Sequence, residues 1–300
     1  MKKHKTTFGG IVFNILDYTF YIVFTLMCVL PFYYLFINTI SNNDLSSRGL
    51  ITFIPKGVHF NNYIQVLQIP GLLNSAIISI LRTVVGAGLT IAASAFLGFL
   101  FTKKTMWARK FWYRFLIITM YFNAGIIPWF ITMYNLKLTN NFLAYILPSI
   151  VSPFFIILVK TFVESLPNAL QESAEIDGAG YLRVFISIIF PLITPILATI
   201  AIFAAVWQWN SFIDTVFLVT DQSLFTLQFL LYKYLNEATS LAALIRNTQG
   251  SLGSIDLTNM QTPTSVRMTV SMIVVLPILV VYPYFQKYFV KGIMIGAVKG

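Results

Sequence analysis

Hydrophobic residues in this chain form six long runs separated by polar segments. The runs lie at about residues 11–37, 77–101, 115–133, 142–162, 188–219 and 268–289. A helix needs roughly 20 mostly apolar residues to cross the hydrocarbon core of a bilayer, and each run reaches about that length or exceeds it. The pattern therefore predicts an all-α integral membrane protein with six transmembrane helices.

The first run is predicted to stay in the mature protein. A secretory signal has an apolar segment of only about 7 to 15 residues, and no small-residue cleavage site follows this longer run. The chain is therefore divided into an N-terminal segment 1–10, a first transmembrane helix 11–40, a polar loop 41–72, a core domain 73–290 with five helices, and a tail 291–300. The turn-rich loop has room for a small subdomain or a helix on the membrane surface. Within the core domain, polar segments occupy 164–187 and 220–267.

Composition and charge support a membrane location. The chain is 57% hydrophobic and 10% charged, with a mean hydropathy of +0.78, whereas soluble domains carry about 25% charged residues. The net charge of +10 comes from basic residues scattered at the ends of the apolar runs, without the continuous stripe that binds nucleic acid. The short basic loop from Lys103 to Lys110 places that side in the cytoplasm by the positive-inside rule. Both termini are then cytoplasmic, and the loops 41–72 and 220–267 are external.

A polar stretch at 165–195 lies between the fourth and fifth runs, on the predicted cytoplasmic side. Asn168 can cap a short helix, and a negative charge at Glu172 suits the first turn of such a helix. Ala174 and Gly178 are expected to leave one helix face nearly free of side chains, so that another protein can approach closely. An ordinary loop helix between two spans is the alternative.

The second and third apolar runs each contain polar or helix-breaking residues that need an explanation. Arg82 lies in the second run, where a charge costs roughly 2.5 to 3.5 kcal/mol at the centre of a helix. We favour an arginine that reaches the outer membrane surface; the alternative is one that lines a transport path. Asn123 to Pro128 brings glycine and proline into the third run, which predicts either a broken helix beside a cavity or a packing kink.

The fifth run contains the densest group of polar and aromatic residues. It includes Trp207, Gln208, Trp209, Asn210 and Asp214. On a continuous helix Asn210 and Asp214 share a face with Trp207. Aromatic rings beside hydrogen-bonding side chains suit the apolar faces and hydroxyls of sugars. The alternative is an aromatic belt at the outer interface with Asp214 among lipid headgroups.

A family resemblance follows from the order of residues in the polar stretch. Glu172-Ser-Ala174, Asp177-Gly178-Ala179, Pro191-Leu192 and Pro195 together resemble the cytoplasmic "EAA" loop of bacterial ABC importer permeases. The chain is most similar to carbohydrate-uptake permeases of the maltose-transporter type. Two departures from the family pattern are Ser173 for the middle alanine and Phe190 for the usual leucine.

The likeness covers nearly the whole chain. Pro55-Lys56-Gly57, Trp209-Asn210-Ser211-Phe212 and the ending from Gln286 to Gly300 resemble the subgroup that imports oligosaccharides derived from complex glycans.

The resemblance implies a type I ABC importer permease fold with a cytoplasmic coupling helix. The residues it assigns to coupling with an ATPase are Glu172, Ser173, Ala174, Asp177, Gly178 and Ala179. The candidates for the substrate pathway are Arg82, Asn123, Trp207, Gln208, Trp209, Asn210 and Asp214. No metal site is expected.

The resemblance also implies partners. These are a second homologous permease, two ATPase subunits that bind ATP and Mg, and an extracytoplasmic solute-binding protein, a lipoprotein if the cell is Gram-positive. Loop 220–267 is expected to touch the binding protein. This chain itself is expected to bind no cofactor, and to lie in a bacterial cell membrane in contact with lipid and an oligosaccharide.

Three functions are compared. A permease subunit moving an oligosaccharide by alternating access fits best, because the chain has no phosphate-binding Gly-x-x-x-x-Gly-Lys loop with which to hydrolyse ATP itself. A self-sufficient secondary transporter would show internal repeats and buried ion-coupling carboxylates, and Asp214 is the one plausible deep carboxylate. A membrane enzyme would need a metal set, a nucleophile elbow or a carboxylate pair, and none of these is visible in the sequence.

Overall fold

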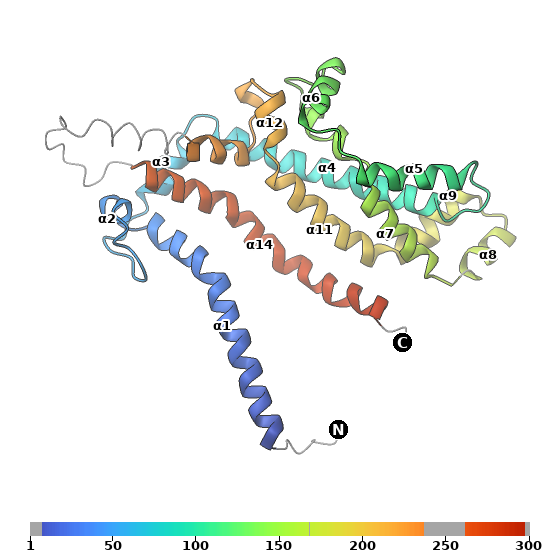
Figure 1. Cartoon of the computed structure of the whole chain (residues 1–300), viewed down its shortest axis with the longest axis horizontal. Helices are drawn as coiled ribbons and strands as arrows, with labels where there is room; N and C mark the ends of the chain where they lie inside the picture. Colours follow the sequence, from blue (N-terminus) through green and yellow to red (C-terminus); the bar gives the residue numbers. More distant parts are fainter. Residues whose placement is uncertain (1–7, 168, 237–261, 298–300) are drawn as a thin grey trace. The chain divides into compact units, whose positions relative to one another are not determined.

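The computed structural model describes residues 8–167, 169–236 and 262–297, with side chains as far as residue 283. No strand occurs among these described residues, which confirms the all-α prediction (Figure 1). Within the described part of the chain, three helices are long and apolar enough to cross a membrane: α1 (Phe8–Thr39), α4 (Leu72–Leu100) and the Pro263–Pro283 part of α14 (Pro263–Ala297). Three bent pairs raise the number to six if each pair is one span.

Glycine or proline lies at each of these bends. Helices α5 (Arg109–Tyr121) and α6 (Ile126–Asn135) meet at 119°, with Gly125 between them at φ 87. The pair made of η1 (Phe142–Tyr145) with η2 (Leu147–Ser149) and α7 (Pro153–Glu164) bends by 45°, and Pro153 opens α7. Proline fits the first turn of a helix because the N–H it lacks has no intrahelical partner there.

The third pair bends more sharply than the second. It comprises α9 (Tyr181–Val184), a π-helical turn (Phe185–Ile189), α10 (Phe190–Leu192) and α11 (Thr194–Asn210), with 78° between its two halves. Pro191 and Pro195 flank this bend.

The chain forms two compact units, residues 1–69 with 233–275 and residues 70–232 with 276–300, and each is described by itself. In the first unit α1 is exposed along most of its length and is buried only at Ile37, Asn38 and Thr39. This end meets the short helices α2 (Asn43–Ser47) and α3 (Asn61–Leu67).

A buried hydrogen-bond network holds the first unit together. The Asn62 amide donates to the carbonyl of Thr39 at 2.9 Å and to Oδ1 of Asn43 at 2.8 Å. The hydroxyl of Ser46 donates to Oδ1 of Asn38 at 2.7 Å. The polar segment after α1 therefore folds as a small subdomain stabilised by amide and hydroxyl contacts.

In the second unit α7 and α11 pack against α4 (Figure 1). Their shared core includes Ala95, Phe99, Val159, Ile189 and Ile200. Small residues on α4 let the helices approach closely: a Cβ added to Gly98 would lie 2.7 Å from Cβ of Val159. The small residues of this run therefore serve helix packing, as is common in membranes.

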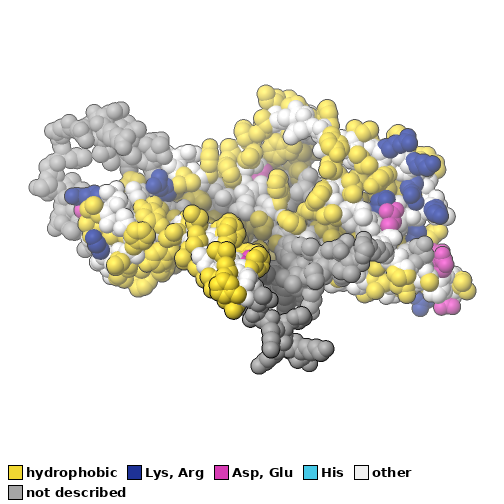
Figure 2. All heavy atoms as spheres, turned by 60° about the horizontal axis from the view of Figure 1, so that its bottom comes forward, with side chains coloured by type: hydrophobic (Ala, Val, Ile, Leu, Met, Phe, Trp, Pro, Cys, Tyr) yellow, Lys and Arg dark blue, Asp and Glu magenta, His cyan; other side chains and the backbone are white. Residues whose placement is uncertain are grey.

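Polar contacts gather at the two ends of the second unit. At one end Lys103 Nζ, just beyond α4, lies 2.9 Å from Oε1 of Glu175 in the predicted coupling loop. Lys, Arg, Asp and Glu side chains cluster visibly at this end, at the right of Figure 2. The expected placement of these two loops on the same side is confirmed by this ion pair.

At the other end Asn140, beyond α6, accepts hydrogen bonds from the backbone N–H groups of Thr220 and Asp221. The Asp221 carboxylate in turn accepts from the N–H of Ser223, and this hydrogen bond lowers the pKa of Asp221 below its usual value. The segment that follows α6 thus meets the start of the predicted external loop 220–267. Most of the predicted external loop 220–267, at 237–261, lies outside the described residues.

Candidate functional site

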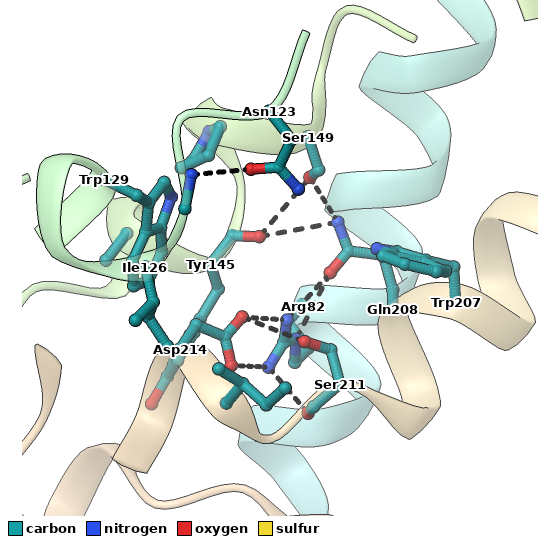
Figure 3. Close-up of a pocket in the computed structure, with 14 residues that line it drawn as sticks. Arg82, Asn123, Ile126, Trp129, Tyr145, Ser149, Trp207, Gln208, Ser211 and Asp214 are labelled. Carbon is teal, nitrogen blue, oxygen red and sulfur yellow. Dashed lines mark hydrogen bonds and ion pairs between the residues drawn. The ribbon is translucent and has the colours of Figure 1, made fainter. Parts of the chain in front are cut away.

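A pocket of about 470 Å³ opens in the second unit between α4, α6, η1, η2, α11 and α12 (Ile213–Leu218). It brings together five of the residues predicted to line a substrate pathway. These are Arg82, Asn123, Trp207, Gln208 and Asp214. Figure 3 shows them converging with Trp129, Tyr145, Ser149 and Ser211. The volume lies within the usual range of small-molecule sites, roughly 300 to 1,000 Å³.

A buried ion pair forms one wall of this pocket. Nη2 of Arg82 lies 2.6 Å from Oδ2 of Asp214, and Nη1 lies 3.2 Å from Oδ1. The guanidinium also stands 4.5 Å from the ring centroid of Tyr145. Arg82 is only 1% exposed, so our favoured prediction that it reaches the outer membrane surface is wrong. Its charge is instead compensated by a carboxylate from another helix, which offsets part of the cost of burial.

Gln208 connects this ion pair to η2, which lies between η1 and α7. Its Oε1 accepts hydrogen bonds from Nε and Nη2 of Arg82 at 3.2 and 3.1 Å. Its Nε2 donates to the hydroxyl of Ser149 at 2.7 Å. The absence of a side chain at Gly86 permits this position, because a Cβ there would lie 2.4 Å from Nε2 of Gln208.

Two predicted pathway residues do not line the pocket. The sequence was interpreted as one helix through 188–219, but α11 ends at Asn210 and Ser211 is extended at ψ 131. Asn210 and Asp214 therefore do not share a helix face, and that prediction is wrong. The amide of Asn210 donates to the carbonyl of Val206, and Trp209 lies in an apolar groove with residues of α4 and α14.

The break in the helix is also what delivers Asp214 to Arg82. The carbonyl of Ser211, freed from the helical pattern, accepts from Nη1 of Arg82 at 3.2 Å. Asp214 lies in the first turn of the next helix, α12, and its carboxylate points toward Arg82. A continuous helix would satisfy the Ser211 carbonyl internally, so the break and the ion pair depend on each other.

Sequence reasoning did not single out Trp129, Tyr145 or Ser149 as pocket residues. Trp129 follows directly on the predicted break at Asn123 to Pro128, which was the available signal for it. Tyr145 donates from its hydroxyl to the carbonyl of Leu224 at 2.7 Å. Nothing in the local sequence around Tyr145 or Ser149 distinguishes them from an ordinary apolar span.

The predicted coupling helix is present as α8 (Ala169–Ile176). Glu172 lies in its first turn and is exposed, as are Ser173 and Asp177. The proposed cap, Asn168, lies outside the described residues. The ion pair between Lys103 and Glu175 ties α8 to the end of α4.

Of the two residues predicted to form a bare helix face, Ala174 is turned inward, contrary to expectation, whereas Gly178 lies beyond the end of α8 and is exposed. Ala174 is 9% exposed and packs in the core cluster with Val163 and Phe185. The physical reason is that the small alanine lets α8 lie close against its own bundle. The face presented outward instead includes Glu172 and Ile176, which is 85% exposed. Ile176 was not among the residues predicted for ATPase coupling.

Gly178 and Ala179 end the helix. Gly178 has φ 80, a left-handed conformation that glycine adopts readily. Its N–H donates to the carbonyl of Glu175, and the N–H of Ala179 donates to that of Ala174 at 2.9 Å. This pair of bonds is a Schellman motif, so both residues have a structural role in stopping α8.

Comparison with known proteins identifies the chain's relatives. The family model described as "Binding-protein-dependent transport system inner membrane component" matches residues 90–295. Protein LplC of Bacillus subtilis is 33% identical over 298 residues, covering 99% of this chain and 98% of that protein. The polygalacturonan/rhamnogalacturonan transport system permease protein YtcP of Bacillus subtilis is 28% identical over 289 residues, covering 96% and 99%.

A solved structure agrees in fold along nearly the whole chain. It is a bacterial ABC transporter described as involved in the import of the acidic polysaccharide alginate, with a TM-score of 0.81 and 26% identity over 94% of this chain and 98% of that one. The predicted type I permease fold is confirmed, and the chain belongs to the family of inner membrane components of binding-protein-dependent transport systems.

Proposed function

We propose that this permease moves an oligosaccharide into a bacterial cell by alternating access driven by ATPase subunits. The partners proposed are a second homologous permease, two ATPases that bind ATP and Mg, and an extracytoplasmic solute-binding protein. Both termini lie in the cytoplasm in this arrangement. The names of relatives support a saccharide cargo, since these include permeases for polygalacturonan/rhamnogalacturonan and for arabinooligosaccharides.

The observation that carries the coupling role is the placement of α8. This helix exposes Glu172 and Ile176 while Ala174 and the Lys103–Glu175 ion pair anchor it to the bundle. An exposed helix that is fixed to several spans can pass a displacement to all of them. The ATPases, on closing around ATP, would move α8 and with it the helices that line the pocket.

The pocket supports the choice of a polar organic solute. It combines aromatic rings from Trp129, Tyr145 and Trp207 with the amide of Asn123. Sugar rings have apolar C–H faces that stack on aromatic rings and hydroxyls that bond to amides. A secondary transporter is not favoured, because Asp214, the carboxylate that could bind a coupling ion, is paired with Arg82.

The coupling role is tested by binding of the purified permease pair to its ATPases. Ile176→Asp is expected to weaken the complex at least ~10-fold, because it places a new charge on a surface that would be desolvated on docking. Asp221→Asn, an exposed carboxylate at the opposite end of the unit, is the control and should leave assembly unchanged. Normal assembly of Ile176→Asp, or solute uptake by proteoliposomes that contain no ATPase, would contradict the proposal.

A further inference from the structure

The hydrogen bonds of Arg82 leave none of its donors for a ligand. A guanidinium has five N–H groups. Arg82 donates twice to Oε1 of Gln208, once to each carboxylate oxygen of Asp214, and once to the carbonyl of Ser211. Its side chain is also almost fully buried, so its positive charge is committed within the chain.

The negative partner is equally occupied. Oδ1 of Asp214 accepts from Arg82 and from the N–H of Thr215, and Oδ2 accepts from Arg82 and from the hydroxyl of Ser211. Arg82 and Asp214 are the cation and the anion among the described residues that line the pocket. The pocket wall contributed by this chain is therefore electrically neutral and has no unpaired charge.

The groups that remain available are uncharged. Nδ2 of Asn123 and the indole N–H groups of Trp129 and Trp207 donate no hydrogen bond within the described part of the chain, and all three residues line the pocket. Trp207 is 72% exposed, so its ring is open to a ligand. Amide and indole donors together with open aromatic faces suit hydroxyls and the apolar face of a sugar ring.

We propose that this pocket accepts uncharged sugar units and discriminates against acidic and cationic ones. The inference rests on the proposed transport of an oligosaccharide and adds the charge of the cargo. A uronate carboxylate or an ammonium group entering the pocket would lose water without gaining an opposite charge, which is unfavourable. The Arg82–Asp214 pair is then a positioning element that fixes the pocket wall rather than a sugar ligand.

This cargo differs from that named for two of the similar proteins. One relative is a permease for polygalacturonan/rhamnogalacturonan. The similar solved structure is that of a transporter involved in the import of the acidic polysaccharide alginate. A shared fold does not fix ligand charge, because the charge preference depends on which side chains in the pocket remain unpaired.

Binding of paired probes, one neutral and one charged on the same sugar backbone, tests the proposal. Trigalacturonic acid is compared with its fully methyl-esterified form, and tri-N-acetylchitotriose with its de-N-acetylated form. Each is titrated by saturation-transfer NMR onto the complete transporter in lipid nanodiscs without the solute-binding protein. The neutral member of each pair is expected to bind at least ~10-fold more tightly than the charged one.

A gain-of-binding variant keeps the test independent of stability. Ile126→Lys places an unpaired cation in the pocket and should admit trigalacturonic acid, whereas Ile127→Lys, at the neighbouring position outside the lining, should not. Equal or tighter binding of the acid by the unmodified transporter would overturn the charge assignment while leaving saccharide transport intact. If no saccharide binds or stimulates ATP turnover, the proposed function fails, and this inference fails with it.

Discussion

Gly86→Ala should destabilise the second unit even though alanine is the better helix former. Replacing glycine with alanine inside a helix gains about 1 kcal/mol. The added Cβ, however, would lie 2.4, 2.7 and 3.1 Å from Nε2, Cδ and Cγ of Gln208. Contacts this short force Gln208 to move. Its hydrogen bonds to Arg82 and Ser149 hold it in place, so the movement breaks at least one of them.

The free energy lost through the clash with Gln208 is expected to exceed the free energy gained from alanine's higher helix propensity. Each hydrogen bond to a charged group contributes about 1.5 to 3 kcal/mol, and loss of the Gln208 acceptor leaves buried N–H groups of Arg82 without a partner. Loss of one such bond, less the helix gain, gives an expected net loss in unfolding free energy of about 0.5 to 2 kcal/mol. It can be measured on the purified protein in mixed micelles by SDS-induced unfolding.

Two comparisons decide whether this reasoning holds. Gly88 lies on the same helix with no heavy atom within 4 Å of an added Cβ, so Gly88→Ala should be neutral or slightly stabilising. In a Gln208→Ala background the clashing atoms are gone, and Gly86→Ala should then cost nothing. If Gly86→Ala and Gly88→Ala change the unfolding free energy equally in the otherwise unmodified protein, Gln208 does not occupy the space beside Gly86.

Three other substitutions test neighbouring contacts. Arg82→Met should lower the unfolding free energy by about 3 to 5 kcal/mol, because it leaves Asp214 buried and unpaired. In SDS unfolding, the double variant with Asp214→Leu should recover most of that loss. Additive losses from the two substitutions would argue against the ion pair. Gly98→Ala should lower the unfolding free energy by about 1 to 3 kcal/mol, because the added Cβ pushes α4 away from α7. The loss should appear as a lower melting temperature, with Gly88→Ala again as the control. An unchanged melting temperature would contradict the close packing. Lys103→Met should speed deuterium uptake in α8, because it removes the ion pair with Glu175, whereas Lys104→Met should not. Equal uptake in both variants would show that Lys103 does not anchor α8.

The sequence specified the helical membrane architecture because the physical cause of that architecture is local. A run of about 20 apolar residues is stable in a bilayer wherever it occurs, so composition alone indicates the spans. The bends were also locally encoded, at Gly125 in the third run and at Pro191 and Pro195 at the start of the fifth. The break at Ser211 was missed because it has no glycine or proline and depends on Arg82, far away in the sequence.

The candidate site was only partly predictable for the same reason. Polar residues in apolar runs identified most of the pocket, since such residues are costly unless they have partners. The identity of those partners is a tertiary property: Arg82 and Asp214 meet only because α11 packs on α4 and the chain breaks after α11, which brings the start of α12 to Arg82. Likewise, the spacing of Ala174 and Gly178 suggested a small-residue face, but it could not show that Ala174 packs within this chain while Gly178 lies exposed beyond the helix.

Helix α4 offers a direct mechanical connection between the two functional regions. It carries Arg82 within the pocket wall, and it ends close to Lys103, which is bonded to Glu175 of α8. At about 1.5 Å per residue, the helix spans roughly 27 Å between Arg82 and its end. A displacement of α8 therefore reaches the pocket along one continuous helix, without a flexible segment to absorb it. The pocket end is held equally firmly, because Gln208 and Asp214 tie Arg82 to α11 and α12. A movement that begins at α8 must therefore shift these helices together or break the buried ion pair, and the cost of breaking it favours the concerted movement.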